Sequence, residues 1–150
     1  MKRIMALMTL ALAAMVVALL PGTASSDLID PIELKIDFKN VTCTQVDSNI
    51  SCSGKITGLG NTQAVRITIE ATRVCTNRGS NDPPGQVSGQ SSPLPVRNGQ
   101  VTFTDVQTQA KPCPDFMTAT FGPTATVCVV ATQGTLPGGE TSRCEQVPIT

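Results

Sequence analysis

Hydrophobic and polar residues alternate along much of the chain after residue 30. The pattern is clearest at 32–38 and at 65–72, where aliphatic or aromatic residues alternate with charged residues and threonines. A period of two residues places successive side chains on opposite faces of a strand, one of which can be buried. Both stretches are therefore predicted to be β-strands with one face on a core.

Turn residues divide the remaining chain into shorter segments rich in valine, isoleucine and threonine. We expect further strands at 41–46, 50–57, 93–96, 101–106, 118–132 and 141–149. Pro93 and Pro95 restrict their strand to a sheet edge, and Asn98-Gly99 predicts a tight hairpin. Gly122 and Pro123 are expected to interrupt the run at 118–132. Residues 76–92, rich in Gly, Pro, Ser and Asn, are expected to form one long polar loop.

The fold class follows from these strands and from the lack of any helical period after residue 24. We predict an all-β protein, an immunoglobulin-like antiparallel β-sandwich of about seven to nine strands, cross-linked by disulfides. The likeness to immunoglobulin domains is architectural only. The chain has no Trp and no Tyr, so their buried tryptophan and tyrosine corner are absent.

The first residues have the pattern of a secretory signal peptide. Lys2 and Arg3 precede an apolar run over 4–20, and Pro21 and Gly22 end it before several small residues. We predict a signal peptide over residues 1–24, with cleavage between 24 and 26, and a single secreted β-sandwich domain over 27–150. The alternative is a membrane anchor, but the run is short for one and no basic cluster follows it.

The charge of the predicted secreted part argues against two classes of partner. Cleavage removes Lys2 and Arg3 and leaves a slight excess of acidic residues, without any basic patch. We therefore expect no nucleic-acid partner and no binding to an anionic membrane surface after signal cleavage. The protein is expected outside the cell or at the cell surface.

All six cysteines lie in the predicted secreted domain, and an even number in an oxidising compartment predicts disulfides. They are Cys43, Cys52, Cys75, Cys113, Cys128 and Cys144. Without histidine or a Cys-x-x-Cys motif, a zinc site is not expected. We predict no metal and no cofactor.

The hairpin registers predict how the cysteines pair. With Asp47-Ser48 as a two-residue loop, Cys43 lies opposite Cys52 in a non-hydrogen-bonded pair about 4.5 Å apart, facing the core. A hairpin centred on Leu136 places Cys128 opposite Cys144 on the outer face. Cys75 and Cys113 remain, and their bond would close a long segment.

The residue types present support few kinds of catalysis. Without histidine the chain has no Ser-His-Asp or Cys-His catalytic arrangement, and bonded cysteines supply no thiolate. A glycosidase needs two carboxylates across a cleft, usually with apolar walls, and only four phenylalanines are present. We expect no enzymatic activity, and a carboxylate-dependent hydrolase is the weaker alternative.

The stretch CTNRGSNDPPGQ at 75–86 has two interpretations. Asn77, Asn81 and Asp82 carry oxygens that could help bind calcium, but the alternating acidic run of a dedicated calcium loop is missing. The same residue types also form turns by bonding to their own backbone. We interpret the stretch as an ordered loop that can contact a partner.

The spacing in this stretch resembles that of a group of small secreted, mostly bacterial β-domain proteins without known function. The matching residues are Cys75, Asn77, Gly79, Asn81, Pro83, Pro84, Gly85 and Gln86. The Gly-Leu-Gly-Asn turn at 58–61 is also similar, and the resemblance covers residues 40–105. Ser80 stands where the group usually has glycine. The resemblance implies a secreted β-domain and no particular activity.

The sequence thus predicts a non-enzymatic extracellular or cell-surface-associated domain that has a binding or structural role. A protein or cell-surface partner would contact 76–92 and 107–117, joined by the bond between Cys75 and Cys113. The alternative is a secreted protease inhibitor that presents the 91–99 loop, with Leu94 or Arg97 inserted into the enzyme. The candidate contact residues are Asn77, Arg78, Asn81, Asp82, Gln86, Leu94 and Arg97.

Overall fold

The computed structural model describes residues 35–77, 79 and 84–150, so the predicted signal peptide lies outside it. This part of the chain contains eight strands and one short 3₁₀ helix, and no helix in it is long and apolar enough to cross a membrane. The elements are β1 (Asp37–Val46), β2 (Asn49–Thr57), β3 (Ala64–Thr76), β4 (Gly85–Gln90), β5 (Leu94–Pro95), β6 (Val101–Gln107), β7 (Thr118–Gln133), η1 (Pro137–Gly139) and β8 (Ser142–Pro148).

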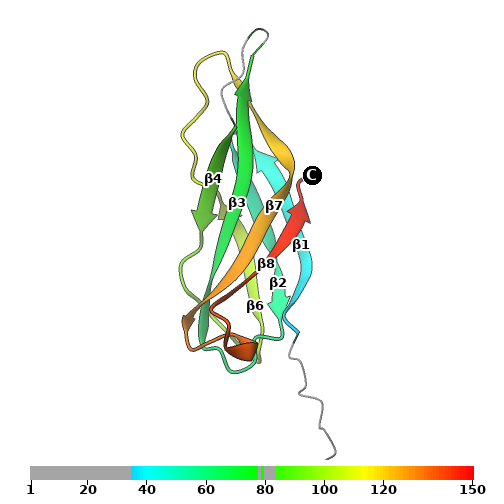
Figure 1. Cartoon of the computed structure of the whole chain (residues 1–150), viewed down its shortest axis with the longest axis vertical. Helices are drawn as coiled ribbons and strands as arrows, with labels where there is room; N and C mark the ends of the chain where they lie inside the picture. Colours follow the sequence, from blue (N-terminus) through cyan, green and yellow to red (C-terminus); the bar gives the residue numbers. More distant parts are fainter. Residues whose placement is uncertain (1–34, 78, 80–83) are drawn as a thin grey trace, which may run out of the picture.

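The strands form two antiparallel sheets, which confirms the predicted all-β sandwich. One sheet has the order β1-β2-β6 and the other the order β4-β3-β7-β8, with β5 paired to the beginning of β3. Figure 1 shows that the long strands β3 and β7 run almost the whole length of an elongated, twisted molecule. β3 pairs with β4, β5 and β7 and is therefore the strand on which the larger sheet is built.

Aliphatic side chains from both sheets fill the core between them. Val65, Ile67 and Ile69 of β3 are fully buried, as the period-two pattern predicts, and they pack with Val127 and Val129 of β7. Among the described residues, Phe103 is the one buried aromatic side chain, and the other large buried side chains are aliphatic. The core is therefore built mainly from β-branched residues, which suit a pleated surface.

Hydrogen bonds join the two sheets at both lateral edges. On one side the amide of Thr150, just after β8, donates to the carbonyl of Cys43 in β1 at 2.9 Å. On the other side the amide of Gln109, just after β6, donates to the carbonyl of Ser88 in β4, also at 2.9 Å. These bonds cover part of the strand edges, which would otherwise expose unpaired backbone groups.

All three predicted disulfides are present, and none of the six cysteines is free. Cys43 and Cys52 face each other with Cα atoms 4.2 Å apart, and both are fully buried. Cys128 and Cys144 face each other on the outer side of the larger sheet, where Cys144 is exposed. The hairpin registers that predicted these two bonds are therefore confirmed.

Two predicted breaks in strands were wrong. Two separate strands were predicted at 32–38 and 41–46. In the described part of the chain they form one strand, β1, with an irregularity between Lys39 and Thr42. β7 continues through Gly122 and Pro123, because the pairing of β3 with β7 shifts between Ala71 and Arg73 and the proline lies at this bulge. A bulge tolerates proline, since no ladder hydrogen bond is required there.

The expected loop at 76–92 was also wrong in its second half. Gly85–Gln90 is strand β4, paired with Thr68–Arg73 of β3. Of its side chains only Val87 is buried, so the segment has no hydrophobic period that sequence analysis could detect. The strand is formed by pairing with β3, and Gly89 allows its backbone to approach the end of β6 closely.

We expect Gly89→Ala to lower the free energy of unfolding by about 1–3 kcal/mol. A Cβ atom at this position would overlap the carbonyl oxygen of Gln107 and the Cα of Thr108, and backbone cannot move aside easily. Gly85→Ala in the same strand is the matched control, because its Cβ would meet nothing. Urea unfolding measures both variants, and equal stability of the two would contradict the close contact.

Candidate contact surface at the loop end

Two connections meet at one end of the sandwich, which we call the loop end and define as residues 46–48 and 110–117. The first joins β1 to β2, and the second leads from β6 to β7. In Figure 1 this end lies at the top, beside the point where β3 ends and β7 begins. From Ala110 to Met117 no residue is buried, so this connection lies on the surface of the molecule.

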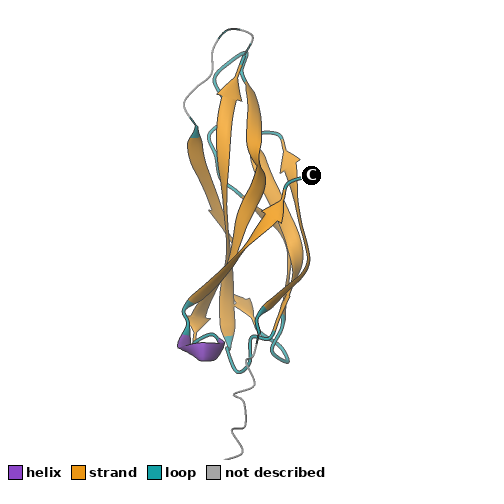
Figure 2. Cartoon of the chain, turned by 45° about the vertical axis from the view of Figure 1, so that its right-hand side comes forward, coloured by secondary structure: helices purple, strands orange, loops and turns teal. Residues whose placement is uncertain are grey.

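The opposite end is closed by buried side chains. Leu59 and Leu136, from two different turns, are almost completely buried there. The hydroxyl of Thr62 lies 2.7 Å from the carbonyl oxygens of both Leu59 and Thr135 and links these turns. Figure 2 shows the short 3₁₀ helix Pro137–Gly139 at this end. The two ends therefore differ, since only one is sealed by the core.

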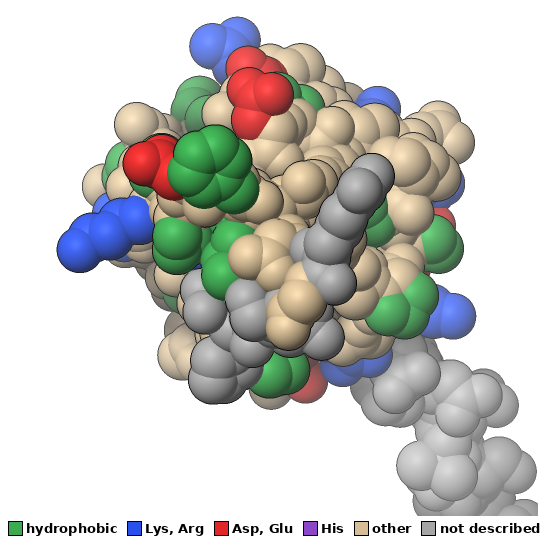
Figure 3. Space-filling model, turned by 90° about the horizontal axis from the view of Figure 1, so that it is seen from above, with side chains coloured by type: hydrophobic (Ala, Val, Ile, Leu, Met, Phe, Trp, Pro, Cys, Tyr) green, Lys and Arg blue, Asp and Glu red, His purple; other side chains and the backbone are tan. Residues whose placement is uncertain are grey.

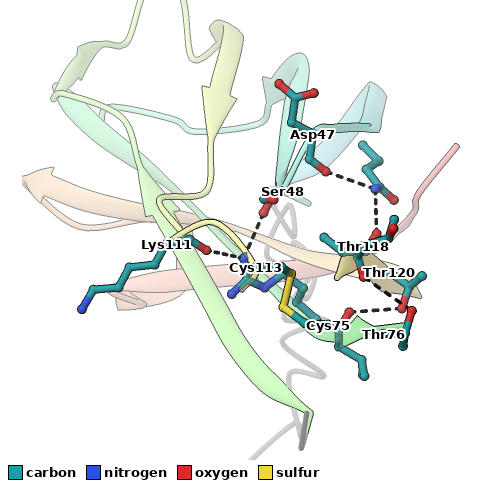
Figure 4. The surroundings of a disulfide bond; sticks show 12 residues. Asp47, Ser48, Cys75, Thr76, Lys111, Cys113, Thr118 and Thr120 are labelled. Carbon is teal, nitrogen blue, oxygen red and sulfur yellow. Dashed lines mark hydrogen bonds between the residues drawn. A yellow bond between two sulfur atoms is a disulfide. The ribbon is translucent and has the colours of Figure 1, made fainter. Parts of the chain in front are cut away.

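A disulfide and an arginine fix the connection at 110–117. Cys75, at the end of β3, is bonded to Cys113. From the same strand, Arg73 donates through Nη1 to the carbonyl of Lys111 at 2.7 Å and to that of Ser48 at 3.4 Å. Figure 4 shows both bonds beside the disulfide. The guanidinium thus links the two connections of the loop end to β3.

Gln45 adds a second polar link. Its Nε2 donates to the carbonyl of Asp47 at 3.2 Å and to that of Ala119 in β7 at 3.1 Å (Figure 4). The β1–β2 turn is therefore held against the beginning of β7, across the two sheets. Backbone carbonyls fixed in this way leave the side chains of the loop end free to face solvent.

Phe116 is the most unusual residue of the loop end. It is 97% exposed, and its φ of 67° lies in the left-handed region. The amide of Met117 donates to the carbonyl of Pro114 at 3.0 Å and closes the turn that contains it. For a residue with a side chain this backbone conformation costs roughly 1–2 kcal/mol. Such strain is typical of sites that bind a ligand or a partner.

Val46 lies at the same end and is 42% exposed. In the described part of the chain, Val46 and Phe116 are the large hydrophobic residues with exposed side chains. Asp47 and Asp115, next to them in sequence, are exposed as well. Figure 3 views the molecule from this end, and hydrophobic, acidic and basic side chains are seen close together. The loop end thus combines apolar groups with charge.

The structure places the predicted contact residues in several different regions. Arg78, Asn81 and Asp82 lie outside the described residues. Asn77 Oδ1 accepts from the amide of Gly79 at 2.9 Å, which is the turn-forming bond expected of this residue type. Gln86 is exposed on the outer face of β4, where its Nε2 donates to Thr72 Oγ1 at 2.9 Å.

Leu94 and Arg97 lie far from the Cys75–Cys113 bond. Leu94 pairs with Val65 at the beginning of β3 and is half-buried against the core, whereas Cys75 lies near the end of this long strand. Arg97 is exposed in the hairpin with Asn98 and Gly99. The described members of the predicted set, Asn77, Gln86, Leu94 and Arg97, therefore do not form one surface.

Sequence analysis did not identify Phe116 as a functional residue. The stretch 111–117 (KPCPDFM) contains two prolines and lacks a strand period, so an irregular segment could be predicted there. The chain has only four phenylalanines. One of them in a segment without a strand period was a sign that its ring could be exposed for a function. Its exposure depends on how the turn at Pro114–Met117 is held by the disulfide, which the sequence pattern does not encode.

Comparison of the chain with protein-family models, curated proteins and solved structures found no match. No group of histidine, cysteine, aspartate and glutamate side chains in the described residues could hold a metal ion. Function is therefore inferred from the surface groups of this chain.

We expect Phe116→Asn to raise the free energy of unfolding by about 0.5–1 kcal/mol. Asparagine adopts positive φ much more readily than phenylalanine, and an almost fully exposed ring contributes no packing. Phe116→Ala is the matched control, since it removes the ring but retains the unfavourable φ. Urea unfolding measures both, and a marked loss of stability in Phe116→Asn would show that the ring packs on the domain.

Proposed function

We propose that this protein is a secreted, non-enzymatic binding domain that contacts a protein partner through its loop end. The exposed Phe116, held in a strained turn next to the Cys75–Cys113 bond, is the observation that carries the proposal. The proposed location is outside the cell or at the cell surface, and the signal-like leader and the three disulfides support it. An immunoglobulin-like arrangement, with loops displayed at one end of a sandwich, is part of the same proposal.

A binding role fits the chemistry better than catalysis. The chain has no histidine, and all six cysteines are in disulfides, so the usual nucleophile and base pairs cannot form. A binding surface, by contrast, needs a fixed backbone and an apolar side chain whose burial against a partner is favourable. The loop end has both, because Arg73 and Gln45 donate to the carbonyls of Lys111 and Asp47 and Phe116 exposes its ring to solvent.

The energetics favour a preorganised contact. A connection already ordered by a disulfide loses little conformational entropy on binding, and this improves affinity. A single aromatic residue that enters a pocket commonly contributes about 2 kcal/mol or more to a protein complex. We therefore infer that Phe116 is the main anchor, with Val46 at the edge of the contact.

A protein partner suits this surface better than a lipid membrane. Membrane binding by a peripheral domain needs several apolar side chains together with a basic cluster. The loop end has two exposed large hydrophobic residues, and Asp47 and Asp115 adjoin them in sequence. The partner that fits is a protein with an apolar pocket for an aromatic ring and a polar rim that can meet the exposed Asp47, Asp115 and Lys111.

A photo-crosslinking analogue of phenylalanine at position 116 tests this proposal. On cells of the source organism, we expect a discrete protein adduct from position 116 and none from the same analogue at position 97, near the opposite end. The adduct should be lost when Val46→Ser and Asp115→Asn are added, because they remove the neighbouring contacts. Equal adducts from both positions, or none from position 116, would contradict the loop end as the contact surface.

A further inference from the structure

A polar hollow of about 560 Å³ lies on the flank of the sandwich, where the end of β4 meets the end of β6. It is a shallow depression open to solvent, and Phe116 is not among the residues that line it. The polar side chains used below come from Asn49, Gln90, Thr104, Asp105, Gln107 and Gln109. Residues with carboxamide, hydroxyl and carboxylate side chains thus line the same depression.

Asp105 is held in a fixed position in this hollow. It lies in a bulge of β6 with a φ of 53°, and its amide donates to Ser53 Oγ at 2.9 Å. Its Oδ1 accepts from Ser51 Oγ at 2.7 Å and from Gln107 Nε2 at 2.9 Å. Bulges often redirect a side chain toward a site. Hydrogen bonds from Gln107 and then Ser51 lower the pKa of Asp105 from its usual value, so the group is ionised at neutral pH.

Other polar side chains of the hollow make no hydrogen bonds that stabilise the fold. The side chains of Gln90, Thr104 and Gln109 are exposed and have no hydrogen-bond partner among the described residues. Asn49 differs, because its Oδ1 accepts from the amide of Ala110 at 2.9 Å and helps to shape the wall. The hollow therefore offers a fixed carboxylate beside free carboxamides and a free hydroxyl.

This combination of groups selects among ligand classes. Carboxamides and hydroxyls both donate and accept hydrogen bonds, whereas the carboxylate only accepts. An ammonium group only donates, so it could bond to the carboxamide oxygens and to Asp105 but would make no use of the N–H groups of Gln90 and Gln109. An anion would be repelled by Asp105, and a calcium ion needs more carboxylates than this one. Sugar hydroxyls donate and accept on neighbouring carbons, which matches the whole set.

We propose that the hollow is a binding site for a neutral saccharide. Asp105 would accept from one sugar hydroxyl, and the carboxamides of Gln107 and Gln109 would bond to adjacent hydroxyls. No aromatic residue lines the hollow, so binding would depend on hydrogen bonds exchanged with water. Such bonds contribute little net free energy each, and we expect dissociation constants in the millimolar range.

NMR titration of the ¹⁵N-labelled secreted protein tests the proposal. The probes are the methyl glycosides of glucose, mannose, galactose and N-acetylglucosamine, with putrescine as a cation and sodium phosphate as an anion. We expect at least one glycoside to shift the amides of Thr104–Gln109 and Gln90 saturably. No saturable shift with any of the four glycosides, or a tighter site for putrescine or phosphate, would overturn the saccharide assignment.

Two variants localise the binding. Asp105→Asn retains a residue that tolerates positive φ and can still accept from Ser51, but it loses the charge, and we expect the dissociation constant to rise about tenfold. Gln109→Ala removes a side chain that has no partner in the fold, and it should also weaken binding. Glu145→Gln on β8 is the matched control and should bind as the unmodified protein does.

The titration is independent of the proposed partner at the loop end. Phe116→Asn should leave the saccharide affinity unchanged, whereas it should weaken the protein contact. If the shifts persist equally in Asp105→Asn and Gln109→Ala, the sugar binds elsewhere and the hollow is not the site.

Discussion

The bond between Cys75 and Cys113 is the constraint on which the loop end depends. It ties a connection without strand pairing of its own to β3, the strand that pairs with three others in the larger sheet. The two cysteines are 38 residues apart, and closing such a segment contributes about 3–4 kcal/mol in the chain-entropy account. The bond from Arg73 to Lys111 starts from the same strand, so covalent and polar links hold the connection at the same place.

Two residues with unfavourable backbone conformations lie on either side of the connection from β6 to β7, one within β6 and one just before β7. Asp105 has a φ of 53° and Phe116 a φ of 67°. Aspartate tolerates this region fairly well, whereas for a bulky aromatic it is a real outlier. Hydrogen bonds around Asp105 and the disulfide beside Phe116 provide the stability that such conformations require. Each of these residues presents its side chain, a carboxylate or a ring, to solvent.

The sequence predicted the strands that bury alternate residues, and it missed the features that depend on distant segments. Val65, Ile67 and Ile69 show their period locally, and the turn at Asp47-Ser48 fixed the register that pairs Cys43 with Cys52. β4 has one buried side chain and forms only because β3 lies beside it. The exposure of Phe116 and the hollow at Asp105 likewise arise where segments far apart in sequence meet. The alternation of polar and hydrophobic residues along one strand gives no information on which distant segments come into contact.

The way the core ends explains why the side chains of the loop end are exposed. At the closed end Leu59 and Leu136 fill the space between the sheets. Toward the loop end the last buried residues are Ile50 and Thr108 on the side of the smaller sheet and the small Cys75 and Ala119 on the larger sheet. Beyond them no side chain from 110 to 117 is buried, so hydrophobic burial cannot order this connection. A disulfide and bonds to backbone carbonyls do so instead. Because these links use no apolar side chain of the connection, the ring of Phe116 stays in water, which is the feature on which the proposed protein contact depends.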